Sequence, residues 1–390
     1  MSSGYYLHGL GIINALGSGA EAVAQGLFSG NTSGLMQDTQ WSNGKPAIVG
    51  RARGELVTIP AALSHLASHN NALLLTAYQQ IATIVDAAIH QYGRHRIGVV
   101  LGTSTSGMAE GEAALRQWQQ SGTLPPGYRY LQQELGAPAL FLSQYLELHG
   151  PAYTVSTACT SSAKAFQSAR NLLKHDICDA VIVGGVDSMC SLTIQGFTSL
   201  ESTSSTLCQP MSQHRQGINI GEGAALFLLS REPGDVALLG IGETSDAYHM
   251  SAPSPDGQGA ESAMRAALAD AQLQPEDIDY LNLHATATLK NDEMESHAVS
   301  RVFSQGVPCS GTKPLTGHTL GAAGATELAF CWLALQHGML PPHCWDHAWD
   351  DALPRLQLVD QSTRLAPRIC MSNSFAFGGS NASLIIGLSS

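Results

Sequence analysis

Short apolar runs alternate with helical stretches along this chain, and the alternation begins twice. Runs such as "RIGVVLG" and "DAVIVGGVDSM" have the length and β-branched content of buried strands, whereas "SSAKAFQSARNLLKH" has apolar residues at helical spacing. The pattern begins again near residue 236 with "VALLGIGETSD" and ends in two strands, "RICMSNSF" and "NASLIIGLS". Strands that alternate with helices predict an α/β fold in which helices cover a mostly parallel sheet.

The repeated pattern predicts two similar halves, residues 1–235 and 236–390, which meet at "SREPGD". No low-complexity linker separates them, so we expect two halves of one compact body rather than two independent domains. A chain of 390 residues is long enough for one large duplicated fold. Its 40 glycines suit the many tight turns that such a fold needs.

Composition and charge exclude several classes of function. A net charge of −12 leaves no basic surface to neutralise phosphates, so we expect no nucleic-acid partner. The start of the chain lacks a basic segment and a cleavage site, and the apolar runs are too short to span a membrane. The eight cysteines show no C-x-x-C spacing, which is typical of buried free thiols in a reducing compartment. We therefore expect a cytoplasmic protein without a membrane span.

Cys159, in "TVSTACTSSAKAF", lies between a short apolar strand and a helical stretch. A thiol becomes a strong nucleophile when it ionises, and the partial positive charge at a helix N-terminus lowers its pKa. The same turn allows the backbone N–H of Cys159 to face a developing oxyanion. The alternative is a buried structural cysteine among small residues.

Other candidate side chains also lie where strands end and helices begin, which is where sites collect in α/β sheets. One group begins at the end of the strand "IDYLNLHAT", and another lies in "GTKPLTGHTLGAAGATE" and extends into the helix after it. A histidine at a strand end is, on its own, an ordinary turn residue. The recurrence of such residues at several junctions favours a shared site formed by Cys159, His284, Thr286, Thr288, Lys313, His318 and Glu327.

Four segments resemble the signature segments of the β-ketoacyl-ACP synthases, the elongating condensing enzymes of type I and II with the thiolase-like fold. They are "STACTSS", "HATAT…ND", "KPLTGHTLGAAGATE" and "NSFAFGGSNASL", and they occur in the family's order. The resemblance extends along nearly the whole chain. It implies two similar βαβαβαββ halves that form a layered α-β-α-β-α body.

The resemblance also assigns roles to individual residues. It implies that Cys159 carries the acyl chain as a thioester and that His284 and His318 are the catalytic histidines. Lys313 and Glu327 match a charged pair that orders the site, and the hydroxyls of Thr286 and Thr288 match groups that hold the phosphopantetheine arm. Phe377 matches a gating residue whose N–H joins that of Cys159 in the oxyanion hole, and Gly378 and the glycine after it allow the close turn there.

The implied reaction is a decarboxylative Claisen condensation, in which a malonyl thioester loses CO₂ and attacks the acyl group on Cys159. We expect no metal and no organic cofactor, because phosphopantetheine arrives on the carrier protein. A weaker alternative is a structural cation in a polar cluster of Asn282, Glu295, Glu327 and Ser372. The implied partners are the acyl carrier protein and a second subunit, which is either an identical copy or a chain-length factor that resembles a ketosynthase.

The chain departs from the family pattern at several positions. Alanines replace frequent glycines at Ala285, Ala287 and Ala376, where each adds a methyl group beside the pantetheine channel. Glu201 occupies a position that is commonly basic and contacts the carrier protein. Thr105 aligns with a position at the floor of the acyl pocket that is often Ile, so a longer or less aliphatic chain is one interpretation and simple drift is the other.

Competing functions remain at this point. A chain-length-factor-like subunit without catalysis generally lacks the nucleophile, whereas this chain has Cys159 and both histidines. A degradative thiolase uses a second active-site Cys and lacks "KPLTGH", and a Cys hydrolase needs an orienting pair that nothing marks here. Among ketosynthases, we favour a dedicated pathway such as aryl-polyene or polyketide-like lipid synthesis over primary fatty-acid elongation. The primer and the acyl chain length are not predicted.

Overall fold

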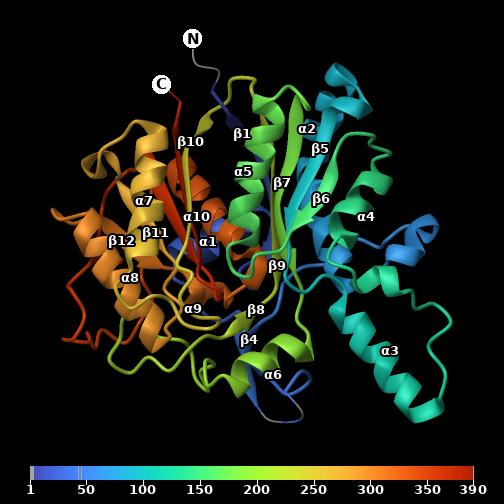
Figure 1. Ribbon diagram of the computed structural model, residues 1–390, viewed down its shortest axis with the longest axis horizontal. Coiled ribbons are helices and arrows are strands. Elements are labelled where there is room, and N and C mark those ends of the chain that lie inside the picture. Colours follow the sequence, from blue (N-terminus) through green and yellow to red (C-terminus); the bar gives the residue numbers. More distant parts are fainter. Residues whose placement is uncertain (1–3, 43, 45, 390) are drawn as a thin grey trace.

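The computed structural model describes residues 4–42, 44 and 46–389 (Figure 1). The strands of the first half are β1 (Tyr6–Asn14), β5 (Ile97–Gly102), β6 (Ala152–Val155), β7 (Ala180–Asp187) and β9 (Gly223–Ser230). Those of the second half are β10 (Val236–Ser245), β11 (Tyr280–Leu283), β12 (Pro308–Gly311), β14 (Ile369–Phe375) and β15 (Ser380–Leu388). The short strands are β2 (Gly17–Ser18), β3 (Leu35–Asp38), β4 (Ala47–Gly50), β8 (Ile220–Gly221) and β13 (Gln357–Leu358).

The helices alternate with these strands as the sequence predicts. In the first half they are α1 (Ala20–Phe28), α2 (His69–Tyr92), α3 (Met108–Ser121), α4 (Ala137–Tyr145), α5 (Ser161–Lys174) and α6 (Ser191–Ser199). In the second half they are α7 (Gln258–Ala271), α8 (Leu289–Val302), α9 (Lys313–Thr316) and α10 (Ala323–His337). Short 3₁₀ segments complete the described chain: η1 (Ala61–Leu66), η2 (Arg94–Arg96), η3 (Tyr130–Gln133), η4 (Pro275–Asp277) and η5 (Leu320–Ala322).

The two halves repeat one topology, which confirms the predicted duplication. The strand order of the first half is β6-β5-β7-β9-β1, and that of the second half is β12-β11-β14-β15-β10. In each half the strands at one end pair in parallel and the final two pairings are antiparallel. A short antiparallel contact between β1 and β10, at Tyr6↔Ala237 and Leu7↔Val236, joins the two sheets.

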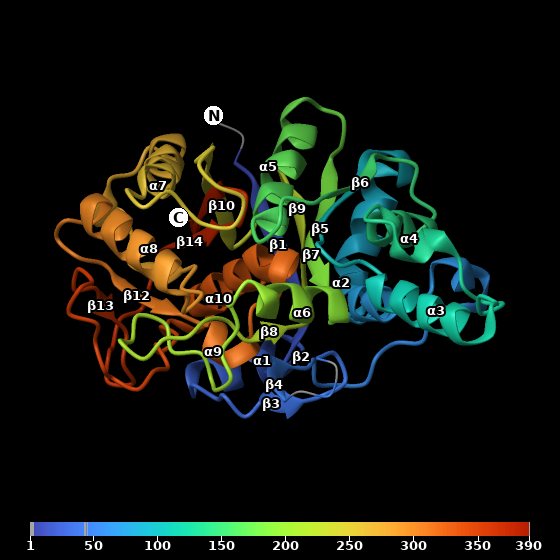
Figure 2. The same cartoon turned by 60° about the horizontal axis from the view of Figure 1, so that its bottom comes forward.

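Helices form three layers around these sheets, as Figures 1 and 2 show. Helices α5 and α10 pack against each other and contact strands of both halves, so they form the middle layer. Helices α2 and α4 cover the outer face of the first sheet, and α7 and α8 cover that of the second. This is the layered α-β-α-β-α body that the family resemblance implies.

The middle helices pack closely because small residues face each other where they cross. A Cβ atom on Gly324 of α10 would lie 2.7 Å from the backbone nitrogen of Ala163 on α5. Close-packed cores resist such added volume. The junctions that precede these helices, between β6 and α5 and between β12 and α10, therefore lie near each other.

One described helix, α2, has the length and apolar composition of a membrane span. Its leucines belong to a buried core cluster that also includes residues of β5, β7 and β9, and α2 packs on strands of the first sheet. The helix therefore serves here as a core element of the first half.

Helix α3 is not predicted by the sequence pattern. Its only buried residue is Ala114, whereas Leu115 and Trp118 are about half exposed. The segment therefore lacks the continuous apolar stripe that identifies a core-facing helix. It extends from the body as an arm at the lower right of Figure 1.

Candidate active site

Cys159 lies on a tight turn between β6 and α5, and α5 begins two residues later at Ser161. Ala158 has a left-handed backbone with φ of 53°. The Ser161 hydroxyl donates a 2.5 Å hydrogen bond to the Ala158 carbonyl and accepts one of 2.9 Å from the Thr157 N–H. This turn fixes the direction of the Cys159 side chain, which is 5% exposed.

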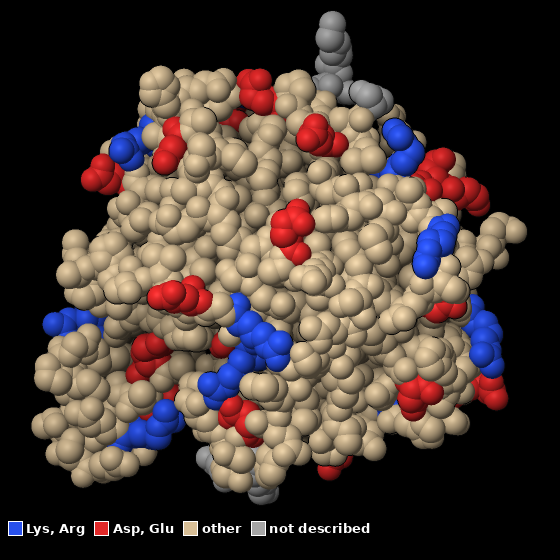
Figure 3. All heavy atoms as spheres, turned by 180° about the vertical axis from the view of Figure 1, so that it is seen from behind, with Lys and Arg blue, Asp and Glu red and all other residues tan. Residues whose placement is uncertain are grey.

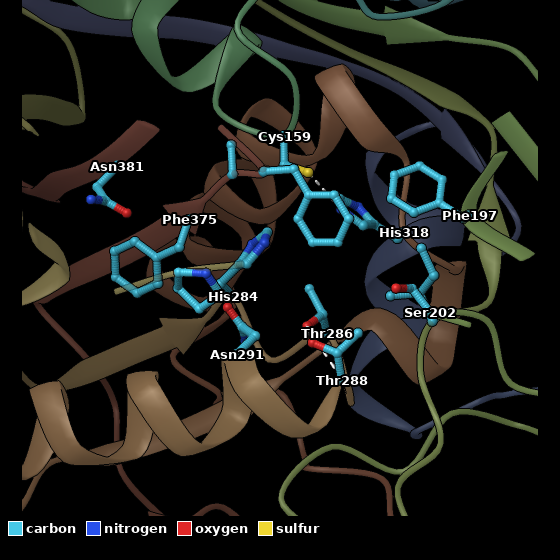
Figure 4. Close-up of a pocket in the computed structure, with 14 residues that line it drawn as sticks. Cys159, Phe197, Ser202, His284, Thr286, Thr288, Asn291, His318, Phe375 and Asn381 are labelled. Atoms are coloured by element: carbon cyan, nitrogen blue, oxygen red, sulfur yellow. Dashed lines mark hydrogen bonds between the residues drawn. The ribbon is translucent and has the colours of Figure 1, made fainter. Parts of the chain in front are cut away.

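His318 contacts the nucleophile directly. Its Nε2 lies 3.0 Å from Cys159 Sγ, as Figure 4 shows. The backbone N–H of Leu320 donates to His318 Nδ1 at 3.2 Å, so Nδ1 carries a lone pair and the neutral ring carries its proton on Nε2. His318 therefore presents a hydrogen-bond donor to the sulfur.

His284 follows β11 and is fixed in a similar way. Its backbone N–H donates to Glu295 at 2.7 Å. The Lys313 ammonium lies 3.3 Å from His284 Nδ1 and also donates to the His284 carbonyl. An ammonium is only a donor, so Nδ1 accepts and Nε2 carries the proton. The rings of His284 and His318 are 5.5 Å apart and nearly perpendicular.

Lys313 also forms a buried ion pair with Glu327. Burial raises the pKa of Glu327 to about 7, and the Lys313 charge opposes that rise. Burial lowers the pKa of both His284 and His318 well below the ordinary value, and the Lys313 charge lowers both further. Both imidazoles are therefore neutral donors at physiological pH.

The expected lowering of the Cys159 pKa is wrong for the free enzyme. Burial raises the pKa of this thiol to about 11, although the Lys313 charge and a hydrogen bond from the Phe377 N–H act in the opposite direction. Removal from water disfavours the thiolate more than these neighbours favour it. A helix start is visible in a sequence, whereas complete burial of the sulfur is not.

Phe377 lies on the turn after β14, and its ring stands 5.4 Å from that of Phe197 on α6. The following glycines have φ of 88° and 77°, so Gly378 and Gly379 supply a left-handed turn that other residues rarely adopt. The Gly378 N–H is held by the Met250 carbonyl at 2.9 Å. This turn aims the Phe377 N–H at Cys159, where the resemblance places the oxyanion hole.

These residues surround a small pocket, drawn in Figure 4. Its enclosed volume is only about 20 Å³, which is room for one or two water molecules. An acyl chain therefore requires side-chain movement, and the largest side chains on the pocket wall are the rings of Phe197, Phe375 and Phe377. The lining is Cys159, Phe197, Ser202, Ile218, Pro253, His284, Thr286, Thr288, Asn291, His318, Phe375, Ala376, Phe377 and Asn381.

Several of these lining residues were not predicted, among them Phe197, Asn291, Phe375 and Asn381. Asn291, Phe375 and Asn381 lie within the segments "HATAT…ND" and "NSFAFGGSNASL", which carry the family resemblance. Phe197, in "GFTSL", lies outside those four segments, and the fold brings it to the pocket.

Thr286 and Thr288 lie on the pocket wall as expected, and their hydroxyl oxygens are 2.9 Å apart. Of the three alanines that replace frequent glycines, only Ala376 lines the pocket. Ala285 and Ala287 are buried and have left-handed φ values of 41° and 61°. Glycine suits those two positions because of the backbone, not because of space in the channel.

The structure does not place Thr105 on the wall of this pocket. Its hydroxyl donates to Asp187 at 2.8 Å, and the residue is 1% exposed. The expectation that Thr105 presents a polar group to the acyl chain is therefore wrong for this conformation, because the hydroxyl is already bound to a buried carboxylate.

The expected polar cluster fits a cation in part. Asn282 Oδ1, Glu327 Oε2 and Ser372 Oγ are buried and have no hydrogen-bond partner among the described residues. Asn282 and Ser372 are paired in register on β11 and β14. Both oxygens of Glu295 already accept backbone N–H groups of residues 284 and 285. The oxygens left over are the kind that a hard cation binds.

Cys159 Sγ, one ring nitrogen of His284 and one of His318 lie within 4.8 Å of one another, which is close enough for a metal ion. The tautomers of the two histidines argue against a metal ion bound between these three residues. Both Nδ1 atoms accept hydrogen bonds, so the Nε2 atoms that remain carry protons rather than free lone pairs.

Two family models match this chain. The model described as "Beta-ketoacyl synthase, N-terminal domain" matches residues 9–233, and "Beta-ketoacyl synthase, C-terminal domain" matches residues 236–345. The chain belongs to the beta-ketoacyl synthase family.

Two relatives and one solved structure support this assignment. Nodulation protein E of Rhizobium meliloti is 31% identical over 91% of this chain and 96% of its own. A 3-oxoacyl-[acyl-carrier-protein] synthase 2 of Staphylococcus aureus is 30% identical over 76% of this chain and 78% of its own. A solved structure described as a ketosynthase (ApeO) in complex with its chain length factor (ApeC), from Xenorhabdus doucetiae, is 48% identical with a TM-score of 0.96, covering 99% of this chain and 98% of that chain.

Proposed function

We propose that this protein is a 3-oxoacyl-[acyl-carrier-protein] synthase that joins an acyl group on Cys159 to a malonyl unit with loss of CO₂. One observation carries the proposal. The thiol and two neutral imidazoles converge within 4.8 Å, and both imidazoles present donors rather than bases. A hydrolase needs a base beside its nucleophile, whereas a condensing enzyme needs a nucleophile and donors for an enolate.

In the first step, Cys159 Sγ attacks the thioester of an acyl carrier, and the carrier thiol leaves as the acyl–sulfur bond to Cys159 forms. The N–H groups of Cys159 and Phe377 hold the oxyanion. Because the pKa of the free thiol is about 11, its proton must leave as the bond forms. The carrier sulfur accepts that proton as its own bond to the acyl carbon breaks, so the carrier leaves as a thiol.

In the second step, a malonyl thioester loses CO₂, and the electron pair of the broken bond becomes an enolate. The Nε2–H groups of His284 and His318 donate to the enolate oxygen. Its carbon then attacks the thioester on Cys159, which releases the thiolate and gives a 3-oxoacyl carrier. Lys313 acts as a positioning residue, since it holds His284 Nδ1. The reaction as proposed needs no organic cofactor and no metal.

A second hollow of about 470 Å³ adjoins the active-site pocket and shares Ser202, Thr288 and Phe377 with it. We assign this hollow to the phosphopantetheine arm of the carrier protein. Glu201 lines it together with the basic residues Arg215 and Lys290, so the hollow carries charges of both signs. The carrier protein is proposed to dock at this rim.

A dedicated pathway of the aryl-polyene or polyketide-like type fits better than primary fatty-acid elongation. The solved complex that is 48% identical pairs a ketosynthase with a chain length factor. We therefore propose that the partner subunit here is a chain-length factor or a second copy of this chain. A carrier protein, a dehydratase and a second ketosynthase-like chain encoded beside it would support the dedicated pathway.

All eight cysteines are free, and most are buried, which supports the proposed cytoplasmic location. On the face seen in Figure 3, small groups of basic side chains lie among acidic ones.

The test separates the two steps. Cys159→Ala should abolish acylation of the protein and condensation, yet it should keep measurable decarboxylation of malonyl carrier. His284→Ala or His318→Ala should lower decarboxylation by at least about 10²-fold, the usual effect of losing a positioned donor in a dry site. Acylation should survive better in these His variants. Intact-protein mass spectrometry and CO₂ release report the two steps independently.

His343→Ala is a suitable control, since His343 is a buried histidine that bonds the Gly311 N–H and lies outside the pocket. Once folded, it should retain both steps. Condensation by the Cys159→Ala protein, or wild-type decarboxylation in either catalytic His variant, would refute the assignment.

A further inference from the structure

Asp187 is a carboxylate at the end of β7 that is fully buried, with 0% exposure. Its Oδ1 accepts hydrogen bonds from the Thr103 and Thr105 hydroxyls at 2.7 and 2.8 Å and from the Ser104 and Thr105 N–H groups at 2.8 Å each. Burial raises its pKa, and hydrogen bonds from this turn act in the opposite direction. A buried carboxylate with so many donors fixes the residues that supply them.

Residues 103–106 form the turn that Asp187 holds. Two hydroxyls that donate to Asp187 also accept hydrogen bonds from backbone N–H groups. The Thr103 hydroxyl donates to Asp187 and also accepts the Ser106 N–H at 3.1 Å. The Thr105 hydroxyl likewise accepts the Ser188 N–H at 3.1 Å. Neither hydroxyl is free to turn toward a substrate.

On one side this turn contacts the segment that carries the nucleophile. The Ser104 hydroxyl donates to the Ala158 carbonyl at 3.4 Å. Ala158 is the residue with the left-handed backbone directly before Cys159.

On the other side the same turn contacts the segment that follows His318. A Cβ atom on Gly321 would lie 2.7 Å from the Ser104 nitrogen and 2.8 Å from Asp187 Oδ2. Gly321 follows Leu320, whose N–H holds His318 Nδ1. The Asp187 carboxylate and its turn therefore support both partners of the 3.0 Å contact between Cys159 and His318.

We propose that Asp187 is a positioning residue that sets the distance between Cys159 Sγ and His318 Nε2. The inference rests on the proposed function, because it assigns Asp187 a part in acyl transfer to Cys159. Asp187 itself touches neither the substrate nor the reacting atoms. It acts through Ser104 on one side and through Gly321 on the other.

The test compares Asp187→Asn with Asp279→Asn. The amide places a donor beside the Ser104 N–H, where the carboxylate offered an acceptor. Asp279 is a matched control, since it also accepts two backbone N–H groups, those of Arg368 and Ile369, but lies before β11, outside the active-site pocket. We expect Asp187→Asn to lower the rate of Cys159 acylation by at least about tenfold, as small displacements of reacting groups do. KM for the carrier should stay unchanged, and Asp279→Asn should acylate at the wild-type rate.

A second readout excludes a merely structural role. The rate of Cys159 alkylation between pH 7 and 10 reports the surroundings of the sulfur in protein that circular dichroism shows to be folded at each pH. Asp187→Asn should change that rate, whereas Asp279→Asn should not. This measurement needs no substrate, so it remains decisive even where wild-type protein acylates no carrier and the proposed function fails.

Ser104→Ala covers the case in which Asp187→Asn does not fold. It removes only the hydroxyl that joins the turn to Ala158 and should slow acylation about threefold, the effect of one modest hydrogen bond. A folded Asp187→Asn protein that acylates and alkylates at the wild-type rates would overturn the inference. If the Asp187 variant cannot be made, acylation of Ser104→Ala at the wild-type rate would also overturn the inference.

Discussion

Cys159 combines two properties that oppose each other. The chemistry needs a sulfur nucleophile, yet the site removes that sulfur from water and raises its pKa to about 11. The structure resolves the conflict with donors rather than with a base, because His318 Nε2–H and the Phe377 N–H both point at the sulfur. Negative charge is therefore stabilised only while it forms.

The first prediction at this scale concerns alkylation of Cys159 by iodoacetamide. Because the thiol is the stable form below its raised pKa, the rate should rise about tenfold per pH unit from pH 7 to 10, without a plateau. In urea, where burial is lost, the plateau should begin near pH 9, above the ordinary thiol pKa of about 8.5. Peptide mass spectrometry separates Cys159 from the half-buried Cys344.

The variant Lys313→Met tests how the Lys313 charge affects the pKa of Cys159. The Lys313 charge lowers the Cys159 pKa, so its removal should slow alkylation at every pH in this range. A wild-type plateau near pH 8 would show instead that the folded site lowers the pKa of the sulfur.

At the scale of elements, the connections between strands and helices contribute more to the active site than the strands do. Cys159 lies between β6 and α5, and Lys313 and His318 lie between β12 and α10. These are the same connection in the two halves. The duplicated fold thus supplies the nucleophile from one copy and the donors from the other, and the crossing of α5 and α10 brings the two connections together.

Gly324→Ala tests that crossing. The added Cβ would meet Ala163 Cβ at 2.8 Å, and overpacking of this kind costs about 1–3 kcal/mol of unfolding free energy. The urea midpoint should fall. Gly196→Ala in α6 is the matched control, because nothing lies within 4 Å of its Cβ, and there the midpoint should rise by the equivalent of about 0.5–1 kcal/mol. A rise in both variants would contradict the close crossing.

Much of the fold was predictable because its strands are continuous apolar runs and its central helices have strong periodicity. Helix α3 was not, since only Ala114 of that helix is buried. The site was predictable where residues adjoin along the chain, as in "KPLTGH". It was not predictable where partners are distant: Thr105 meets Asp187 across 82 positions, and Phe197 meets Phe377 only in the folded protein.

At the scale of the whole molecule, the first half exposes an apolar edge. Strand β6 is the end of the sheet, and Tyr153 on it is 37% exposed. The arm α3 adds Leu115 and Trp118, each about half exposed. An unpaired strand edge and exposed apolar side chains on the same half of the molecule are typical of an interface between subunits.

We predict that the protein is an obligate dimer, with β6 at the interface and several thousand Å² buried. Trp118→Glu combined with Tyr153→Glu should give monomers in sedimentation and abolish condensation. Leu365→Glu is the control: Leu365 is also exposed, but it follows β13 at the opposite end of the sheet, and this variant should remain dimeric. A stable, active wild-type monomer would exclude the dimer.

The strand order also governs when the protein can fold during synthesis. Strand β1 forms its main pairing with β9, so this pairing is complete only after Ser230, the last residue of β9, has been synthesised. Strand β10 pairs with β15, so this pairing is complete only after Leu388, the last residue of β15, has been synthesised. Helix α10 is buried between both sheets, so neither half completes its core while the ribosome still holds that region. The nascent chain therefore carries unpaired apolar strands until late in its translation, and we expect cell-free synthesis to yield more active protein with chaperones than without them.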